Sequence, residues 1–224
     1  MAFQAFFIIS LQTLIFTLTL TSTTAIDFNY SYLAVQWPPG YCATTGVQCV
    51  LERPKNSYFT IHGLWPMKNG KGEVVNCNGK PFSGDQIYDR DLMEKYWPNF
   101  VSFDFDRFWK HEWNKHGKCT GWSQSDYFRI TLQRFLDYNV LAHLQGAGIQ
   151  PSDQYKVKVN DISNALSNLN PQLKCARSER FQGYVLQEIH ICVDASGSGI
   201  VKCNGPRNKC VNVPQKEDIF LPSS

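Results

Sequence analysis

The chain has 224 residues, of which 43% are hydrophobic, and its formal net charge is +3. A chain of this length fills one domain well and is short for two. The isoelectric point near 8.4 is mildly basic, and no run of Lys or Arg concentrates the charge. The composition permits a polyanionic partner without requiring one, because an ordinary solvated surface explains the same charge.

The first 25 residues are largely apolar, contain no charged side chain and end in the small residues Thr23-Thr24-Ala25. This pattern predicts a signal peptide over residues 1–25 and a secreted, extracellular domain over residues 26–224. A membrane anchor is the alternative, because the apolar run approaches the roughly 18 to 20 residues that span a bilayer. Threonines in its later half favour the signal peptide.

Eight cysteines follow the predicted signal peptide. An even count in an exported chain predicts four disulfides, and local spacing favours Cys42 with Cys49. The absence of a CxxC pair argues against a structural zinc site and against thioredoxin-type redox chemistry. Asn29 begins the only N-glycosylation sequon, which fits secretion, and is the predicted glycosylation site.

Two stretches in the first third are predicted to be strands. Tyr30–Gln36 is rich in β-forming residues and ends at a turn enforced by Trp37-Pro38-Pro39-Gly40. Ser57–Leu64 repeats the pattern. Strict alternation along this second strand would place four side chains on one face, namely Tyr58, Thr60, His62 and Leu64.

The middle of the chain is predicted to be helical after a loop from Lys68 to Asp85, which Cys77 holds. The apolar period and the terminating residues Pro98 and Gly117 predict three helices. They cover Asp85–Trp97, Asp104–His116 and Ser125–Asn139. Their aromatic stripes are expected to pack in the core.

The last third mixes further strands with a short helix. Strands are predicted over Tyr155–Val159 and Tyr184–Val193, and Asp194–Gly197 turns the second towards Ile200–Cys203. A short helix over Asp161–Leu169 is expected to start at an Asn160 cap. Because no regular βαβ alternation is present, the expected fold is α+β, a single domain with a central, mainly antiparallel sheet flanked by several helices.

The segment from Phe108 to Cys119, FWKHEWNKHGKC, gathers residues suited to chemistry. A zinc protease would need HExxH, whose histidines share one helix face. At about 100° per residue, the histidines of this segment, His111 and His116, lie about 140° apart on a helix. We therefore expect no metal here.

The same geometry places five side chains on one side of the predicted helix, within about 140° of one another. They are Phe108, His111, Glu112, Lys115 and His116. Such a cluster suits a phosphodiester, whose transition state gathers negative charge on its non-bridging oxygens. Lys115 and a protonated His111 could stabilise that charge while His116 moves a proton.

RNA carries its own nucleophile, the 2′-hydroxyl group. A ribonuclease therefore needs a base for that hydroxyl and an acid for the departing 5′-oxygen, and two histidines suffice. His62 is the candidate for the second histidine, because Gly63 beside it allows close approach. Taken alone, an isolated histidine on a strand is more often structural.

FTIHGLWP (Phe59–Pro66) and FWKHEWNKHGKC together resemble the two active-site segments of the ribonuclease T(2) family, and the resemblance spans nearly all of the mature chain. It implies that His62 is the catalytic acid, His116 the base and His111 a phosphate ligand. It also implies that Glu112 and Lys115 stabilise the pentacoordinate intermediate. The implied substrate is single-stranded RNA, the product ends are 2′,3′-cyclic phosphates, and no cofactor is needed.

The resemblance further implies substrate-binding and disulfide positions. A base pocket matches Gln36, Asn99, Val101 and Phe108, and Trp65 stacks a second base, although packing alone would explain Trp65 and Phe108. The implied disulfides are Cys42–Cys49, Cys77–Cys119, Cys175–Cys210 and Cys192–Cys203.

Plant members of the family include pistil S-RNases, which reject self pollen, and S-like RNases of phosphate recovery, senescence and defence. The basic isoelectric point and the lack of an Asn-Xaa-Asp sequence in CARSERFQGYVLQEIHIC favour an S-RNase. The position of the sequon at Asn29 argues against it, because S-RNases usually carry one further along. An S-RNase would be a monomer whose partners include pollen F-box proteins. A non-catalytic storage or recognition protein is the other alternative, although both histidine motifs are intact.

Overall fold

The computed structural model describes residues 27–50, 58–204, 210, 213 and 218–223. The predicted signal peptide and Ser57 lie outside these ranges. Within them, no helix combines the length and the apolar character needed to cross a membrane.

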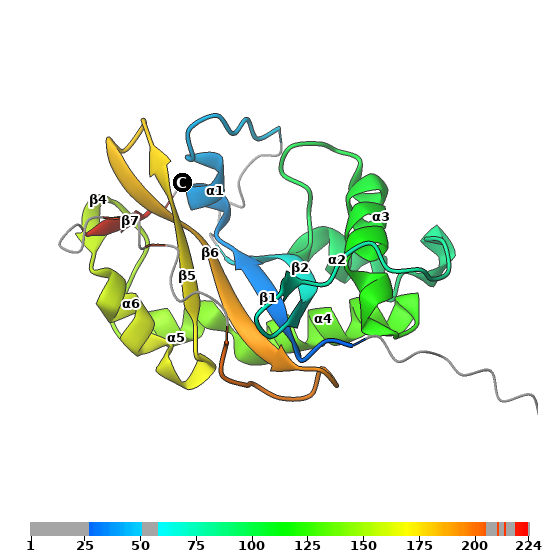
Figure 1. Cartoon of the computed structure of the whole chain (residues 1–224). Coiled ribbons are helices and arrows are strands. Elements are labelled where there is room, and N and C mark those ends of the chain that lie inside the picture. Colours follow the sequence, from blue (N-terminus) through cyan, green and yellow to red (C-terminus); the bar gives the residue numbers. More distant parts are fainter. Residues whose placement is uncertain (1–26, 51–57, 205–209, 211–212, 214–217, 224) are drawn as a thin grey trace, which may run out of the picture.

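The described residues contain one mixed sheet with strand order β3-β2-β1-β6-β7-β4, and β5 also pairs with β6 (Figure 1). The strands are β1 (Tyr30–Gln36), β2 (Thr60–Lys68), β3 (Gly72–Glu73), β4 (Ser152–Val157), β5 (Gln172–Ser178), β6 (Gly183–Asp194) and β7 (Ile219–Leu221). All of these pairings are antiparallel except that of β6 with β7. The sequence prediction of a mainly antiparallel sheet in an α+β domain is confirmed.

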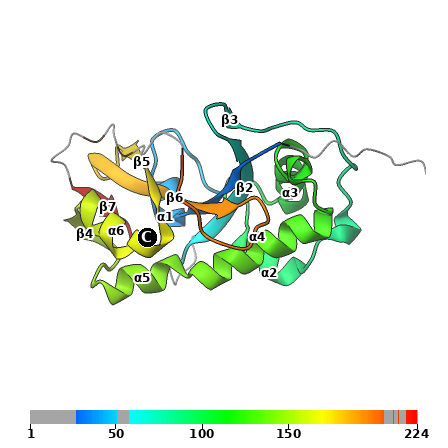
Figure 2. The same cartoon turned by 60° about the horizontal axis from the view of Figure 1, so that its bottom comes forward.

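Helices surround this sheet. They are α1 (Pro38–Cys42), α2 (Arg90–Tyr96), α3 (Phe105–Lys115), α4 (Gln124–Tyr138), α5 (Val140–Gly146) and α6 (Val159–Ala165), with 3₁₀ turns η1 (Gly84–Gln86), η2 (Gly117–Thr120) and η3 (Ser167–Leu169). Helices α4 and α5 run one after the other beneath the sheet (Figure 2). Asn139 separates them, because its backbone is left-handed (φ 34°) and its side chain caps α5.

The central strands divide their side chains between two faces. One face joins the main core with α4, and its strand residues include Leu33, Val35, Ile61, Leu64, Ile189, Ile191 and Val193. The other face carries a smaller cluster that includes Tyr30, Tyr32, Ala34, Trp65, Met67 and Cys192. The candidate active-site residue His62 lies on this second face, next to Trp65.

Strand β2 contains a β-bulge at His62, because Gly63 and Ile61 pair with consecutive residues of β1 and His62 is skipped. The extra residue reverses the alternation of side chains beyond it. Leu64 therefore packs in the main core, and the prediction that it shares a face with His62 is wrong. Trp65 instead contacts the His62 ring, with ring centroids 5.0 Å apart.

Two core side chains bind the backbone of the bulge. The indole N–H of Trp97 donates to the carbonyl oxygen of His62 at 2.8 Å, and the hydroxyl of Tyr127 donates to that of Leu64 at 3.1 Å. Buried carbonyl groups need such partners where a bulge disrupts the ladder. The position of His62 is thus fixed from the core side.

Several predicted elements differ from the structure in their bounds. Helix α2 begins at Arg90 and not near Asp85, because the Asp89 side chain accepts from the backbone N–H of Leu92 at 3.0 Å and caps the helix. Helix α6 follows Lys158, and no side-chain hydrogen bond caps it, so the predicted Asn160 cap is wrong. Strands β3, β5 and β7 and helices α1 and α5 were not predicted; α1 forms where a turn was expected, and β3 lies within the predicted loop.

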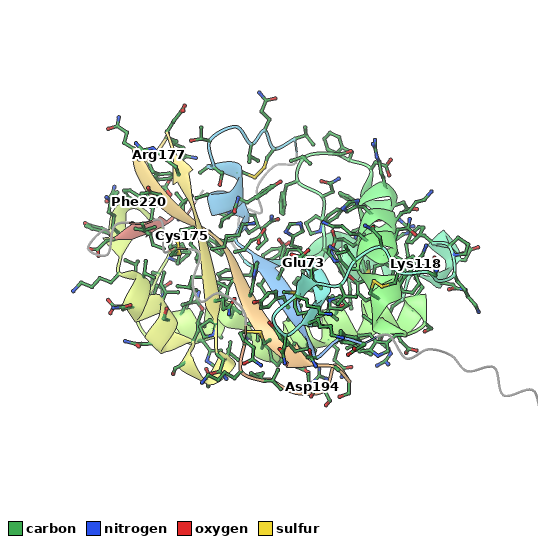
Figure 3. All side chains as sticks on the ribbon, viewed as in Figure 1. Glu73, Lys118, Cys175, Arg177, Asp194 and Phe220 are labelled. Atoms are coloured by element: carbon green, nitrogen blue, oxygen red, sulfur yellow. A yellow bond between two sulfur atoms is a disulfide. The ribbon has the colours of Figure 1, made fainter. Side chains whose placement is uncertain are left out.

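All eight cysteines are in disulfides. The pairs are Cys42–Cys49, Cys77–Cys119, Cys175–Cys210 and Cys192–Cys203, as the family resemblance implies. Figure 3 marks Cys175 on β5. The Cys77–Cys119 bond ties the segment after β3 to η2, directly behind the helix that carries the candidate site.

Candidate active site

Helix α3 brings its polar face against the bulged strand. Asp104 starts the helix by accepting from the backbone N–H of Arg107 at 2.9 Å. Trp109 and Trp113 lie in the main core, which fixes the rotation of the helix. The ring of Phe108 then lies 6.1 Å from that of His62, centroid to centroid.

Glu112 connects α3 to β2 through a buried hydrogen bond. Its side chain is 2% exposed, and Oε2 accepts from the indole N–H of Trp65 at 2.9 Å. A Cβ atom at Gly63 would lie 2.2 Å from this oxygen and 2.3 Å from the indole nitrogen. Gly63 therefore allows close approach, as the sequence predicted, but the groups that approach it are the side chains of Glu112 and Trp65.

His116 ends α3 as its C-cap residue and is buried. Its ring lies 5.4 Å from the Trp65 ring, so Trp65 contacts both His62 and His116. No described protein group hydrogen-bonds to the buried Nδ1 of His116. Gly117 follows without a left-handed backbone, and a Cβ atom there would lie 2.4 Å from the Trp113 ring. Tight packing therefore explains this glycine.

The two candidate histidines have opposite pKa shifts. Burial lowers the pKa of His116 to about 3, and the positive charges of Lys115, His111 and His62 act in the same direction. Burial also disfavours the charged form of His62, but its hydrogen bond to Glu188 and the charges of Glu188 and Glu112 raise its pKa overall. At neutral pH the His116 imidazole is therefore unprotonated and can accept a proton, whereas His62 holds a proton more readily.

Two further groups on the polar face of α3, Glu112 and His111, also have shifted pKa values. Burial raises the pKa of Glu112. Burial and the charges of Lys115 and His62 lower the pKa of the exposed His111. These effects disfavour the protonated form of His111 in the RNA-free protein, and the neutral imidazole can still donate one N–H.

The predicted base pocket is only partly gathered. Phe108 contacts His62, and Gln36 pairs with Glu188 across the sheet. The side-chain oxygen of Asn99 accepts from the backbone N–H of Val101 at 3.1 Å, and Val101 is 47% exposed. Asn99 and Val101 therefore lie together on the loop between α2 and α3.

A cavity of about 410 Å³ opens beside Trp65. Its lining comes from β1, β2, β3, β5 and β6 and consists of Tyr32, Trp65, Met67, Gly72, Glu73, Gln172, Leu173, Lys174 and His190. Glu73, one of these lining residues, is labelled in Figure 3. Its aromatic and polar lining next to the catalytic candidates suits a planar, hydrogen-bonding group.

Sequence reasoning missed three residues behind His62. Nδ1 of His62 lies 2.8 Å from Oε1 of Glu188, and Lys174 and His190 bond to the other carboxylate oxygen at 3.1 and 2.8 Å. The available signal was the spacing of Glu188 and His190, two residues apart on a predicted strand that is otherwise mostly apolar.

Comparisons with known proteins agree with this geometry. A model of the Ribonuclease T2 family matches residues 28–203. Ribonuclease 1 of Arabidopsis thaliana is 33% identical over 213 residues, which cover 91% of this chain and 92% of that protein. The structure of RNase NT in complex with 5′-AMP has a TM-score of 0.75 and 28% identity, and covers 88% of this chain and 98% of that one.

A further structural neighbour is the self-incompatibility-associated SF11-RNase of Nicotiana alata, with a TM-score of 0.71 and 27% identity over 88% of this chain and 100% of that one. The fold and the family match define the class of protein as a ribonuclease. The chain belongs to the ribonuclease T2 family and is an RNA-cleaving enzyme.

Proposed function

We propose that the enzyme cleaves single-stranded RNA by transphosphorylation, with His116 as the base and His62 as the acid. The observation that carries this proposal is the opposite pKa shift of two histidines that contact the same indole ring. At one pH the site therefore contains an unprotonated histidine that can accept a proton and a second histidine that can donate one. The family relationship supports the same reaction.

In the first step, the 2′-oxygen attacks phosphorus and passes its proton to His116. The bond from phosphorus to the 5′-oxygen breaks, and His62 gives that oxygen a proton. The products are a 2′,3′-cyclic phosphate and a free 5′-hydroxyl. In a slower second step, the roles reverse as water opens the cyclic ester. Lys115 and the N–H of His111 stabilise the charge on the non-bridging oxygens.

The cavity beside Trp65 is proposed to hold one base of the substrate, stacked against the indole ring. The bound nucleotide in the RNase NT structure supports nucleotide binding by this fold. Gln36, Asn99, Val101 and Phe108 are proposed to line the site of the second base. The reaction requires no cofactor, because nucleophile, base and acid come from RNA and the two histidines.

Transphosphorylation predicts an absolute requirement for the 2′-hydroxyl. An oligonucleotide with one ribose among 2′-O-methyl nucleotides should be cleaved only after that ribose, in the presence of EDTA, and mass spectrometry should find a cyclic phosphate. The fully methylated oligonucleotide is the matched control and should remain intact. Its cleavage would show that water attacks directly and would remove the proposed roles of the histidines.

For the biological role, we propose a secreted S-RNase that acts as a cytotoxin in gametophytic self-incompatibility. The basic isoelectric point and the similarity to SF11-RNase support it, and the exposed Asn29 is compatible with a glycan. The relatives include both extracellular and intracellular ribonucleases. An S-like RNase in phosphate recovery, senescence or defence is the alternative, and a storage role is favoured less because both histidines are present.

An S-RNase role predicts strong expression in the style, little in leaf, and many divergent alleles at the locus. Transcript abundance in the two tissues and sequencing of unrelated plants would test both expectations together. Uniform expression with a nearly invariant sequence would support the S-like alternative. Pollen F-box proteins are proposed partners only if the allelic diversity is found.

A further inference from the structure

We propose that Glu188 is a positioning residue that holds His62 through Nδ1, so that Nε2 is the nitrogen that exchanges protons with RNA. This inference rests on the acid role of His62 proposed above. It extends the site to β6, because Glu188 lies 126 residues from His62 in the sequence.

The carboxylate of Glu188 is built for this contact. It is 1% exposed, and Oε1 lies 2.8 Å from Nδ1 of His62. The other oxygen binds Lys174 at 3.1 Å and His190 at 2.8 Å. With both oxygens occupied by fixed donors, the carboxylate cannot rotate freely, so it holds the imidazole plane in one orientation.

The sheet makes this contact possible. His62 lies on β2 and Glu188 on β6, with β1 between them. Adjacent strands are about 4.8 Å apart, so the imidazole must reach across β1. There the residue paired with Gly63 is Ala34, which lies on the same face as Trp65. A methyl group at this position leaves room for the ring.

The contact fixes which nitrogen reacts. When His62 is protonated, Nδ1–H donates to Glu188 and Nε2–H is free to protonate the 5′-oxygen. After that transfer the remaining proton stays on Nδ1, because Nδ1–H donates a hydrogen bond to the Glu188 carboxylate. Nε2 is then the acceptor, which the second step needs to remove a proton from water.

The charges around His62 come from three elements. On β6 the Glu188 carboxylate favours the protonated ring, and on β5 Lys174 disfavours it. His190 on β6 bonds to Glu188. From α3, Glu112 favours the protonated form of His62, while the titratable groups His111, Lys115 and His116 complete its surroundings. Removing Glu188 or Lys174 should therefore move the pKa of His62 in opposite directions.

The pH dependence of kcat/KM tests this pair of directions. The alkaline limb reports loss of the proton from His62, because the acid must be protonated. Glu188→Gln should move that limb to lower pH and reduce kcat/KM at pH 7 by roughly ten- to a hundredfold, part of the roughly 10²–10⁴-fold that acid catalysis contributes. Lys174→Met should move the same limb to higher pH. Glu94→Gln is the matched control, because it makes the same change at an exposed position of α2. It should leave the pH profile unaltered.

A substrate that needs no acid separates positioning from structure. Uridine 3′-(4-nitrophenyl phosphate) releases a phenolate without a proton, whereas uridylyl-uridine requires one. Glu188→Gln and His62→Asn should both lose much less activity on the phenyl ester. If His62→Asn loses equally on both substrates, the acid role of His62 is wrong. If only Glu188→Gln loses equally, or if its alkaline limb does not move in a folded protein, the positioning role is wrong. Isotope-edited NMR titration of His62 keeps the test decisive even where turnover is too low to measure.

Discussion

His62→Asn and His116→Asn should each reduce RNA cleavage by about 10³–10⁴-fold at the pH optimum. Each variant removes one of the two groups proposed to transfer protons, the base that accepts from the 2′-hydroxyl or the acid that donates to the 5′-oxygen. At position 62, asparagine retains a polar side chain that can hydrogen-bond to Glu188. It cannot exchange protons near neutral pH. Initial rates on an oligonucleotide, followed by chromatography of the cyclic phosphate product, measure the loss.

The fold should survive both changes. The His62 side chain is 29% exposed, and the backbone of the bulge is held by Trp97 and Tyr127 independently of the ring. Far-UV circular dichroism should match that of the wild type, with a Tm within a few degrees. His143→Asn on α5 is the matched control and should alter neither activity nor stability. Normal cleavage by either active-site variant in a folded protein would contradict the assignment.

Local patterns predicted much of the fold. β1 has the predicted bounds, and α3, α4 and β6 differ from prediction by one residue at each end, because their apolar periods and caps are encoded within the segments themselves. α2 was extended too far, since the loop before it contains Ile87 in phase, and only the cap at Asp89 stops the helix. β5, with sequence QLKCARS, is half polar, and only pairing with β6 makes it a strand.

In the candidate site too, local sequence patterns predicted some residues, and others depend on strand pairing. One helix supplies Glu112, Lys115 and His116, so helical spacing alone could group them. The bulge that turns His62 and Trp65 to one face depends on pairing with β1 and was invisible to strict alternation. Glu188 lies near His62 only because β1 and β6 pair in register, and a buried carboxylate on a strand has no local pattern that identifies its partner. Such contacts require the tertiary fold.

Lys115→Ala should lower kcat by roughly 10²-fold with a much smaller change in KM. The phosphodiester carries one negative charge in the ground state and gains a second as the 2′-oxygen attacks, so a nearby ammonium group stabilises the transition state more than the substrate. Lys110→Ala, an exposed lysine on the same helix, is the matched control. A change confined to KM would make Lys115 a binding residue.

The same variant should also change the pH dependence. The charge of Lys115 lowers the pKa of His116, and the base must be unprotonated to act. Without Lys115 the pKa of His116 rises, so the acidic limb of kcat/KM should move to higher pH, while Lys110→Ala leaves it in place. We therefore expect Lys115 to contribute twice, by stabilising the charge on phosphorus and by keeping His116 unprotonated at acidic pH. A lower kcat with an unmoved acidic limb would leave only the first contribution.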